Sequence, residues 1–105
     1  MDTYCVTFRI ADRAVNGKSY SERRDKLVEN VRSKGGGYWD ETTSFFLVES
    51  NLNTPSFAAQ AADGLSEQYD MLFVFDPKDM SACYFGAVTH VDVLRSFFPK
   101  IQKVK

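Results

Sequence analysis

Histidine, cysteine and long apolar runs are scarce in this 105-residue sequence, and each shortage narrows what the protein can be. The only histidine, His90, would have to serve any Cys/His or Ser/His catalytic dyad, and its place at a predicted helix start favours capping or exposure instead. Cys5 and Cys83 have no spacing typical of zinc ligands or of a redox pair. We interpret them as free thiols of a reducing compartment.

No run approaches the roughly 18 apolar residues of a membrane span, and no basic-then-apolar leader opens the chain. The sequence therefore predicts a cytoplasmic protein with no membrane partner.

Net charge is also small, at −1, which argues against a global field that draws the whole molecule onto nucleic acid or an anionic membrane. The charge is unevenly spread, because residues 1–34 carry eight Lys or Arg against five Asp or Glu, whereas residues 35–81 carry one against eight. The basic first third is a candidate phosphate-binding surface for nucleic acid. Its candidate residues are Arg9, Arg13, Arg23, Arg24 and Lys26. The alternative is a solvated helix face, since Glu22 and Asp25 interrupt the cluster.

Apolar residues are 44% of the chain and nine residues are Phe, so the chain has enough apolar surface for a packed core. We expect one domain over residues 1–105, with a flexible tail over residues 100–105.

The apolar pattern predicts alternating strands and helices. Tyr4, Val6, Phe8 and Ile10 alternate with polar positions, which predicts a strand over residues 3–10. Ser19 or Ser21 is placed to cap a helix over residues 20–34. Further strands are expected over residues 38–41, 44–50, 70–76 and 81–88. Further helices are expected over residues 55–65 and 91–98, capped by Thr54 and Thr89.

This order predicts an α+β fold: a ferredoxin-like βαββαβ sandwich with an extra C-terminal strand and a short helix. Two strands, 45–48 and 71–75, are apolar on both sides, whereas two helices can cover only one face of a sheet. Monomers rarely leave such a face exposed, so we expect a two-fold homodimer with the strand at 81–88 near its boundary. The expected interface residues are Phe45, Leu47, Phe73, Phe75, Tyr84 and Phe85.

The segments YCVTFRI, TTSFFLVES and DMLFVFD resemble strands of the Cas2-like group of small proteins, which includes CRISPR-associated Cas2, the VapD ribonucleases and the SinR-like proteins. The resemblance covers residues 3–76. It implies a dimeric ferredoxin-like domain and, in many members, a metal-dependent nuclease with an aspartate near the end of the first strand. Arg9 stands at that position here, and the nearest acid, Asp12, comes three residues later.

Two classes of function follow. The first is a non-catalytic homodimeric module that binds a protein or nucleic acid and needs no cofactor. The presence of Arg9 where the resemblance expects an aspartate favours this class. The alternative is a Cas2/VapD-type nuclease that uses Mg²⁺. The metal would then be held by loop carboxylates, for which the candidates are Asp12, Asp70, Asp76 and Asp79. Asp76 and Asp79 frame Pro77 and also have a simpler role in ending a strand and making a turn.

Overall fold

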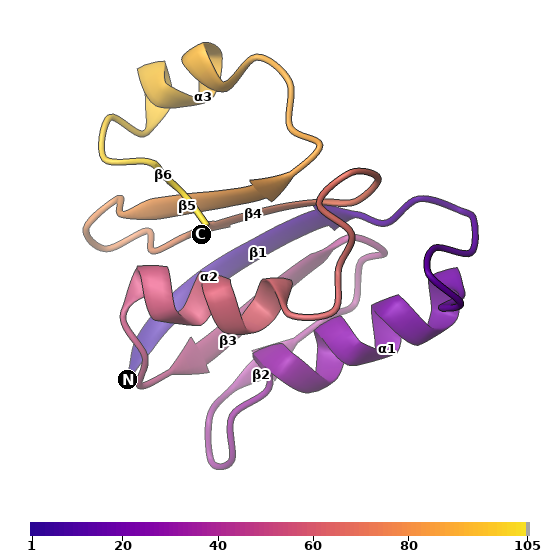
Figure 1. The fold of residues 1–105 in the computed structure, drawn as a ribbon. Coiled ribbons are helices and arrows are strands. Elements are labelled where there is room, and N and C mark those ends of the chain that lie inside the picture. The colour runs from indigo at the N-terminus through magenta and orange to yellow at the C-terminus, as the bar shows by residue number, and fades with distance from the viewer. Residues whose placement is uncertain (105) are drawn as a thin grey trace.

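A computed structural model describes residues 1–104, which form three helices and one six-stranded sheet (Figure 1). The strands are β1 (Asp2–Arg9), β2 (Tyr38–Trp39), β3 (Phe45–Ser50), β4 (Met71–Phe75), β5 (Ala82–Gly86) and β6 (Gln102–Lys103). The helices are α1 (Tyr20–Val31), α2 (Thr54–Ala62) and α3 (Val91–Phe97). The prediction of a mixed α+β fold is confirmed.

The strands lie in the order β2-β3-β1-β4-β5-β6. Neighbours from β2 to β5 are antiparallel, and β6 runs parallel to β5. The sheet is therefore larger than the four-stranded sheet of the predicted sandwich. The strand expected over residues 81–88, which the sequence placed near a dimer boundary, pairs with β4 of its own chain over five residue pairs.

The main core lies between the sheet and the two longer helices. Alternation along β1 places Tyr4, Val6 and Phe8 on this face, as the sequence predicted, and all three are buried. Helix α1 contributes Leu27 and Val31, and the Phe57 ring of α2 stacks on Tyr4 with ring centroids 4.4 Å apart. Each such side chain contributes about 1.5–3 kcal/mol on burial, so this layer provides most of the driving force for folding.

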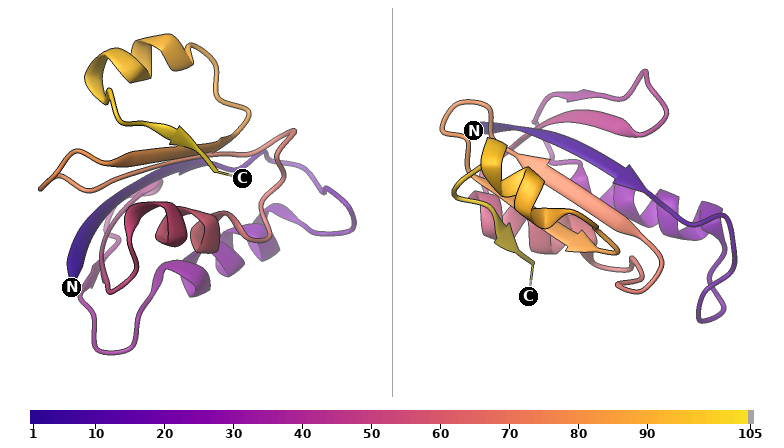
Figure 2. Two further views of the ribbon diagram at one scale, coloured as in Figure 1. Left: turned by 60° about the vertical axis from the view of Figure 1, so that its left-hand side comes forward. Right: turned by 90° about the horizontal axis from the view of Figure 1, so that it is seen from above.

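Helix α3 lies on the other face of the sheet, above β4 and β5 (Figures 1 and 2). Leu94 packs against the same small core as Phe98, the residue after α3. The Phe98 ring lies 5.1 Å from the ring of Phe73 and 5.0 Å from that of Phe75, both on β4. The chain thus covers part of its second sheet face with its own C-terminal segment.

The C-terminal segment corrects the prediction of a flexible tail. Ile101 is buried beside Phe73 and Ala82, and β6 pairs with Cys83 and Tyr84 of β5. The amide of Val104 donates to the carbonyl of Tyr84 as well. Residues 101–104 are therefore ordered by the β5 edge, and residue 105 lies outside the described residues.

Two of the predicted helix caps are also corrected. The cap of α2 is Asn53, whose side-chain oxygen accepts from the Ser56 amide, while the hydroxyl of Thr54 bonds to that of Ser81. The side-chain oxygen of an Asn can accept from the amide three residues later as well as a threonine hydroxyl can. Asn53, the residue before Thr54, therefore acts as the cap of α2. The cap position of α3 is His90, in the left-handed conformation and without a side-chain cap, rather than Thr89.

Helix α1 ends three residues earlier than predicted. Arg32 adopts an extended backbone conformation, and its guanidinium lies 4.6 Å from the centroid of the Tyr38 ring. This contact with the start of β2 stabilises a bend at the point where the periodic pattern alone would continue the helix.

We expect Ser19→Ala to destabilise the protein by about 1 kcal/mol. Ser19 forms a capping box, because its hydroxyl accepts from the Glu22 amide while the Glu22 carboxylate accepts from the Ser19 amide. Urea unfolding followed by circular dichroism measures the loss. Ser21→Ala, two residues further along and without a capping bond, should change stability by only a few tenths of a kcal/mol. Equal effects of the two variants would contradict this role of Ser19.

Candidate functional site

Arg23 of α1 forms a buried ion pair with Asp70, the residue before β4. Their side chains are 2% and 0% exposed, and Nε of Arg23 lies 2.9 Å from Oδ2 of Asp70. The remaining guanidinium hydrogens go to Oδ1 of Asp70 and to the carbonyls of Ala11, Arg13 and Lys18. All five N–H donors are therefore used.

The Asp70 carboxylate is equally well satisfied. Besides Arg23, it accepts from the amide of Ala11 at 2.9 Å and from that of Ser66 at 2.8 Å. The pair thus fastens the loop after β1 and the loop after α2 to the same end of the sheet. Its role is structural, and Arg23 has no donor left for a phosphate, which corrects its place among the candidate nucleic-acid ligands.

The other basic candidates do not share one surface with Arg9. By strand alternation, Arg9 lies on the α3 side of the sheet, whereas Arg24 and Lys26 project from α1 on the opposite side. Two of the guanidinium groups also lie over aromatic rings, Arg13 at 4.2 Å from the Tyr69 centroid and Arg24 at 5.9 Å from the Phe8 centroid. The sequence cluster is therefore divided by the sheet, since neighbours in the chain project from different layers.

The candidate carboxylates are not brought together either. Asp12 follows the Arg9 end of β1, whereas Asp76 follows Phe75, which pairs with Cys5 toward the other end of that strand. Asp76 is buried and accepts from the Lys78 amide, and Asp79 accepts from both the amide and the hydroxyl of Ser81. These last two bonds lower the pKa of Asp79. Both side chains shape the turn between β4 and β5, as their simpler interpretation proposed.

Among residues 1–104, no group of three or more His, Cys, Asp or Glu side chains is placed to hold a metal ion. Cys5 and Cys83 are both free and buried. Burial raises the pKa of both thiols, so neither is poised as a thiolate nucleophile. His90 is exposed at the start of α3.

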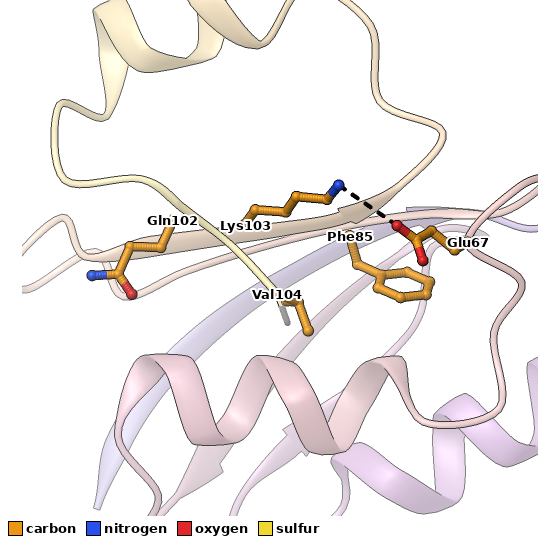
Figure 3. A pocket seen from close by; sticks show the side chains of 5 residues that line it. All are labelled: Glu67, Phe85, Gln102, Lys103 and Val104. Carbon is orange, nitrogen blue, oxygen red and sulfur yellow. Dashed lines mark ion pairs between the residues drawn. The ribbon is translucent and has the colours of Figure 1, made fainter.

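A cavity of about 700 Å³ lies beside β5 and β6 (Figure 3). Its lining residues are Glu67, Phe85, Gln102, Lys103 and Val104. Lys103 and Glu67 reach toward each other with 3.6 Å between Nζ and Oε1. Both side chains are more than half exposed, so this ion pair contributes little. The cavity has apolar side chains in Phe85 and Val104 but lacks the buried, convergent polar groups that orient a small ligand.

The α3 side of the sheet presents a second candidate, an apolar surface without a covering helix. In the strand register, Trp39 is opposite Leu47, and Leu47 is opposite Cys5, so these side chains form one row across β2, β3 and β1. Phe45 and Thr7 form the next row. We call these five residues the open half-face. Trp39 and Leu47 are 39% and 38% exposed, and the Trp39 ring meets the edge of Phe45 at 6.4 Å.

The predicted interface residues divide into three groups. Phe45 and Leu47 belong to the open half-face. Phe73, Phe75 and Tyr84 lie on the same side of the sheet but pack against Leu94 and Phe98. Phe85 points to the opposite side, where it packs against the helix-covered core. The structure thus brings five of the six onto one side and separates Phe85 from them.

Two exposed apolar residues on this side of the molecule were not among the predicted interface residues. Trp39 lies on β2, a strand of only two residues at the border of the sheet, where no further strand covers it. Phe97 of α3 is 69% exposed, the largest value among the exposed large apolar side chains of the described residues. Phe98, and not Phe97, packs beside Leu94 against the small core on this side of the sheet.

Comparison of the chain with family models, with curated proteins and with solved structures finds no match. No helix within residues 1–104 is long and apolar enough to cross a membrane.

Proposed function

We propose that this chain is a non-catalytic interaction module that works as a two-fold homodimer and uses the open half-face as its binding surface. The observation that carries the proposal is the exposure of Trp39 and Leu47, side by side with Phe45 on the part of the sheet face that α3 leaves uncovered. Exposed apolar groups gathered on one face mark interaction sites far more often than isolated ones do. Trp is also among the residues that dominate binding energy in interfaces.

A ferredoxin-like core with two added strands is the fold that we propose within this module. Support comes from the order β2-β3-β1-β4, all antiparallel, with α1 and α2 together on one face (Figure 2). The relationship to Cas2-like proteins rests on the strand segments alone. The two free thiols fit the proposed location in the cytoplasm.

Three features favour binding over a Cas2/VapD-type nuclease. Arg9 occupies the position where the resemblance expects an aspartate, and a cation there repels a divalent metal. Asp70 is committed to Arg23, and Asp76 and Asp79 hold a turn at the other end of the sheet. The division of the basic residues between two layers also favours a protein over nucleic acid as partner.

Sedimentation equilibrium tests the proposal. We expect the native chain to sediment at twice its mass at micromolar concentration, and Leu47→Glu to weaken the dimer by about thirtyfold or more. Tyr20→Glu is a matched control, because Tyr20 is 37% exposed against 38% for Leu47 but lies at the start of α1. Circular dichroism verifies that both variants fold. A native chain that stays monomeric, or equal weakening by both variants, would refute the proposal.

A further inference from the structure

Helix α3 divides its side of the sheet into a raised part and a recessed part. Leu94 and Phe98 fix the helix segment over Phe73, Phe75 and Tyr84 of β4 and β5. The open half-face beside it has no helix, and Figure 2 shows α3 as the one helix on this side of the sheet. Because an α-helix with its side chains is about 10 Å thick, the step between the two parts is about that high.

The raised part has apolar side chains of its own to bury. Val93 and Phe97 are 51% and 69% exposed and lie one turn from each other on α3. Neither belongs to the contact that Leu94 and Phe98 make with the sheet. No residue of α3 is fully buried. The helix is thus packed against its own sheet with one stripe, while a second apolar stripe still faces solvent.

The step determines how two copies can meet. A two-fold axis parallel to the strands exchanges the raised and recessed parts, so that each α3 enters the recess of the other copy. A two-fold axis that is parallel to the sheet but perpendicular to the strands would place α3 of one copy against α3 of the other. The two open half-faces would then be held apart by two layers of helix. Of these two arrangements, only the first buries Trp39 and Phe97 together.

The apolar area fits such a contact. A Trp or Phe ring has about 150–250 Å² to bury, so the exposed fractions of Trp39 and Phe97 leave roughly 200 Å² per copy. Two copies therefore bring about 400 Å² from these rings alone, a third of the roughly 1,200 Å² of a small stable interface. Leu47, Phe45 and Val93 are neighbours that extend the same area.

The charges at one end also match. Arg9 is paired with Met71, and Met71 is paired with Gly86. These residues lie at the end of the sheet where the chain leaves β5 and turns back into α3. Asp92 is the second residue of α3 and lies toward that end, whereas Phe98 packs on Phe75 further along. Rotation about an axis parallel to the strands keeps Asp92 of one copy at the Arg9 end of the other. Arg9 and Asp92 are exposed, and neither has an ion-pair partner within residues 1–104.

We propose that the partner of the open half-face is helix α3 of a second copy, with Phe97 packed on Trp39 and Leu47 and with Arg9 opposite Asp92. This inference rests on the proposed homodimer. It gives the two-fold homodimer expected from the sequence a specific form, a reciprocal exchange of α3 rather than direct packing of two sheet faces, so that each binding surface is completed by the partner copy.

Sedimentation of surface variants tests this arrangement. Phe97→Ser should weaken the dimer by about thirtyfold, whereas Tyr20→Ser, at an exposed aromatic on the helix-covered side, should leave it unchanged. Arg9→Glu and Asp92→Arg should each weaken the dimer by about tenfold, and the double variant should regain most of that loss. All these positions are exposed, so the variants should unfold in urea close to the native midpoint.

The outcomes separate the two proposals. A dimer that is lost in Leu47→Glu but kept in Phe97→Ser would mean sheet-to-sheet packing, which overturns the exchange of α3 and leaves the homodimer standing. A double charge variant that is weaker than either single variant would also overturn the proposed register. A monomeric native chain would overturn both proposals.

Discussion

Asp70→Asn should lower the free energy of unfolding by about 3–5 kcal/mol. The substitution keeps the shape of the side chain but leaves the guanidinium of Arg23 charged, buried and without a counter-charge. Asp70 is fully buried, so water cannot replace the lost charge. A domain of this size is stable by only about 5–15 kcal/mol, so the variant should be unfolded at a much lower urea concentration than the native chain.

Glu67→Gln is the matched control for this prediction. Glu67 pairs with Lys103 at 3.6 Å, but the two side chains are 68% and 58% exposed, so its loss should change stability by less than about 1 kcal/mol. Chemical denaturation of both variants gives the comparison. A loss for Asp70→Asn as small as that for Glu67→Gln would show that the buried ion pair does not fasten the two loops as we describe.

Gly86→Ala should cost about 3 kcal/mol or more. Gly86 has a φ of +86°, and a Cβ on it would lie 2.1 Å from the backbone oxygen of Asp70. The left-handed conformation costs an alanine about 1–2 kcal/mol, and relief of the clash requires a backbone shift at the start of β4. The amide of Ala87 donates to the same oxygen, so that shift also strains a hydrogen bond between the strands.

Gly17→Ala separates the two causes. Gly17 has a similar φ of +78°, but nothing lies within 4 Å of a Cβ built there. Its substitution should cost only the conformational part, about 1–2 kcal/mol. Urea unfolding measures both variants, and equal losses would mean that the close approach at Asp70 relaxes freely.

Local patterns were sufficient for the elements of the main core. The alternation from Tyr4 to Phe8 predicted the buried face of β1, and Ser19 is one of the two serines expected to cap α1. These features depend on neighbours within four residues, which is the range over which propensity and periodicity act. Helix ends were less well predicted, because contacts such as Arg32 with Tyr38 lie outside that range.

The buried ion pair could not be paired from the sequence, because 47 residues separate Arg23 from Asp70. A signal was nevertheless there: Arg23, Leu27 and Val31 are spaced by four along α1, so Arg23 lies on the buried stripe of the helix. The high Lys and Arg content of the segment instead favoured the prediction that Arg23 is a surface cation. A buried Arg needs an acid within reach, and only the folded topology identifies which one.

The position of α3 was undetermined for a different reason. The pattern of β4 requires apolar neighbours on both faces, but it does not state whether they come from the same chain or from a partner. Phe73 receives them from Phe98 and Leu94 of its own chain. The apolar excess of these strands is therefore partly used within the chain, and the part of the strands that stays uncovered lies on the open half-face.

The two outermost strands of the sheet, β2 and β6, are each only two residues long. Strands at the border of a sheet carry unpaired amides and carbonyls, and a long one serves as a template on which further chains add without limit. Here each outermost strand offers only two residues on which a further strand could add, which limits strand-by-strand growth. The homodimer that we propose and resistance to fibril formation would then share one origin, since short outermost strands favour association through side chains on the faces of the sheet.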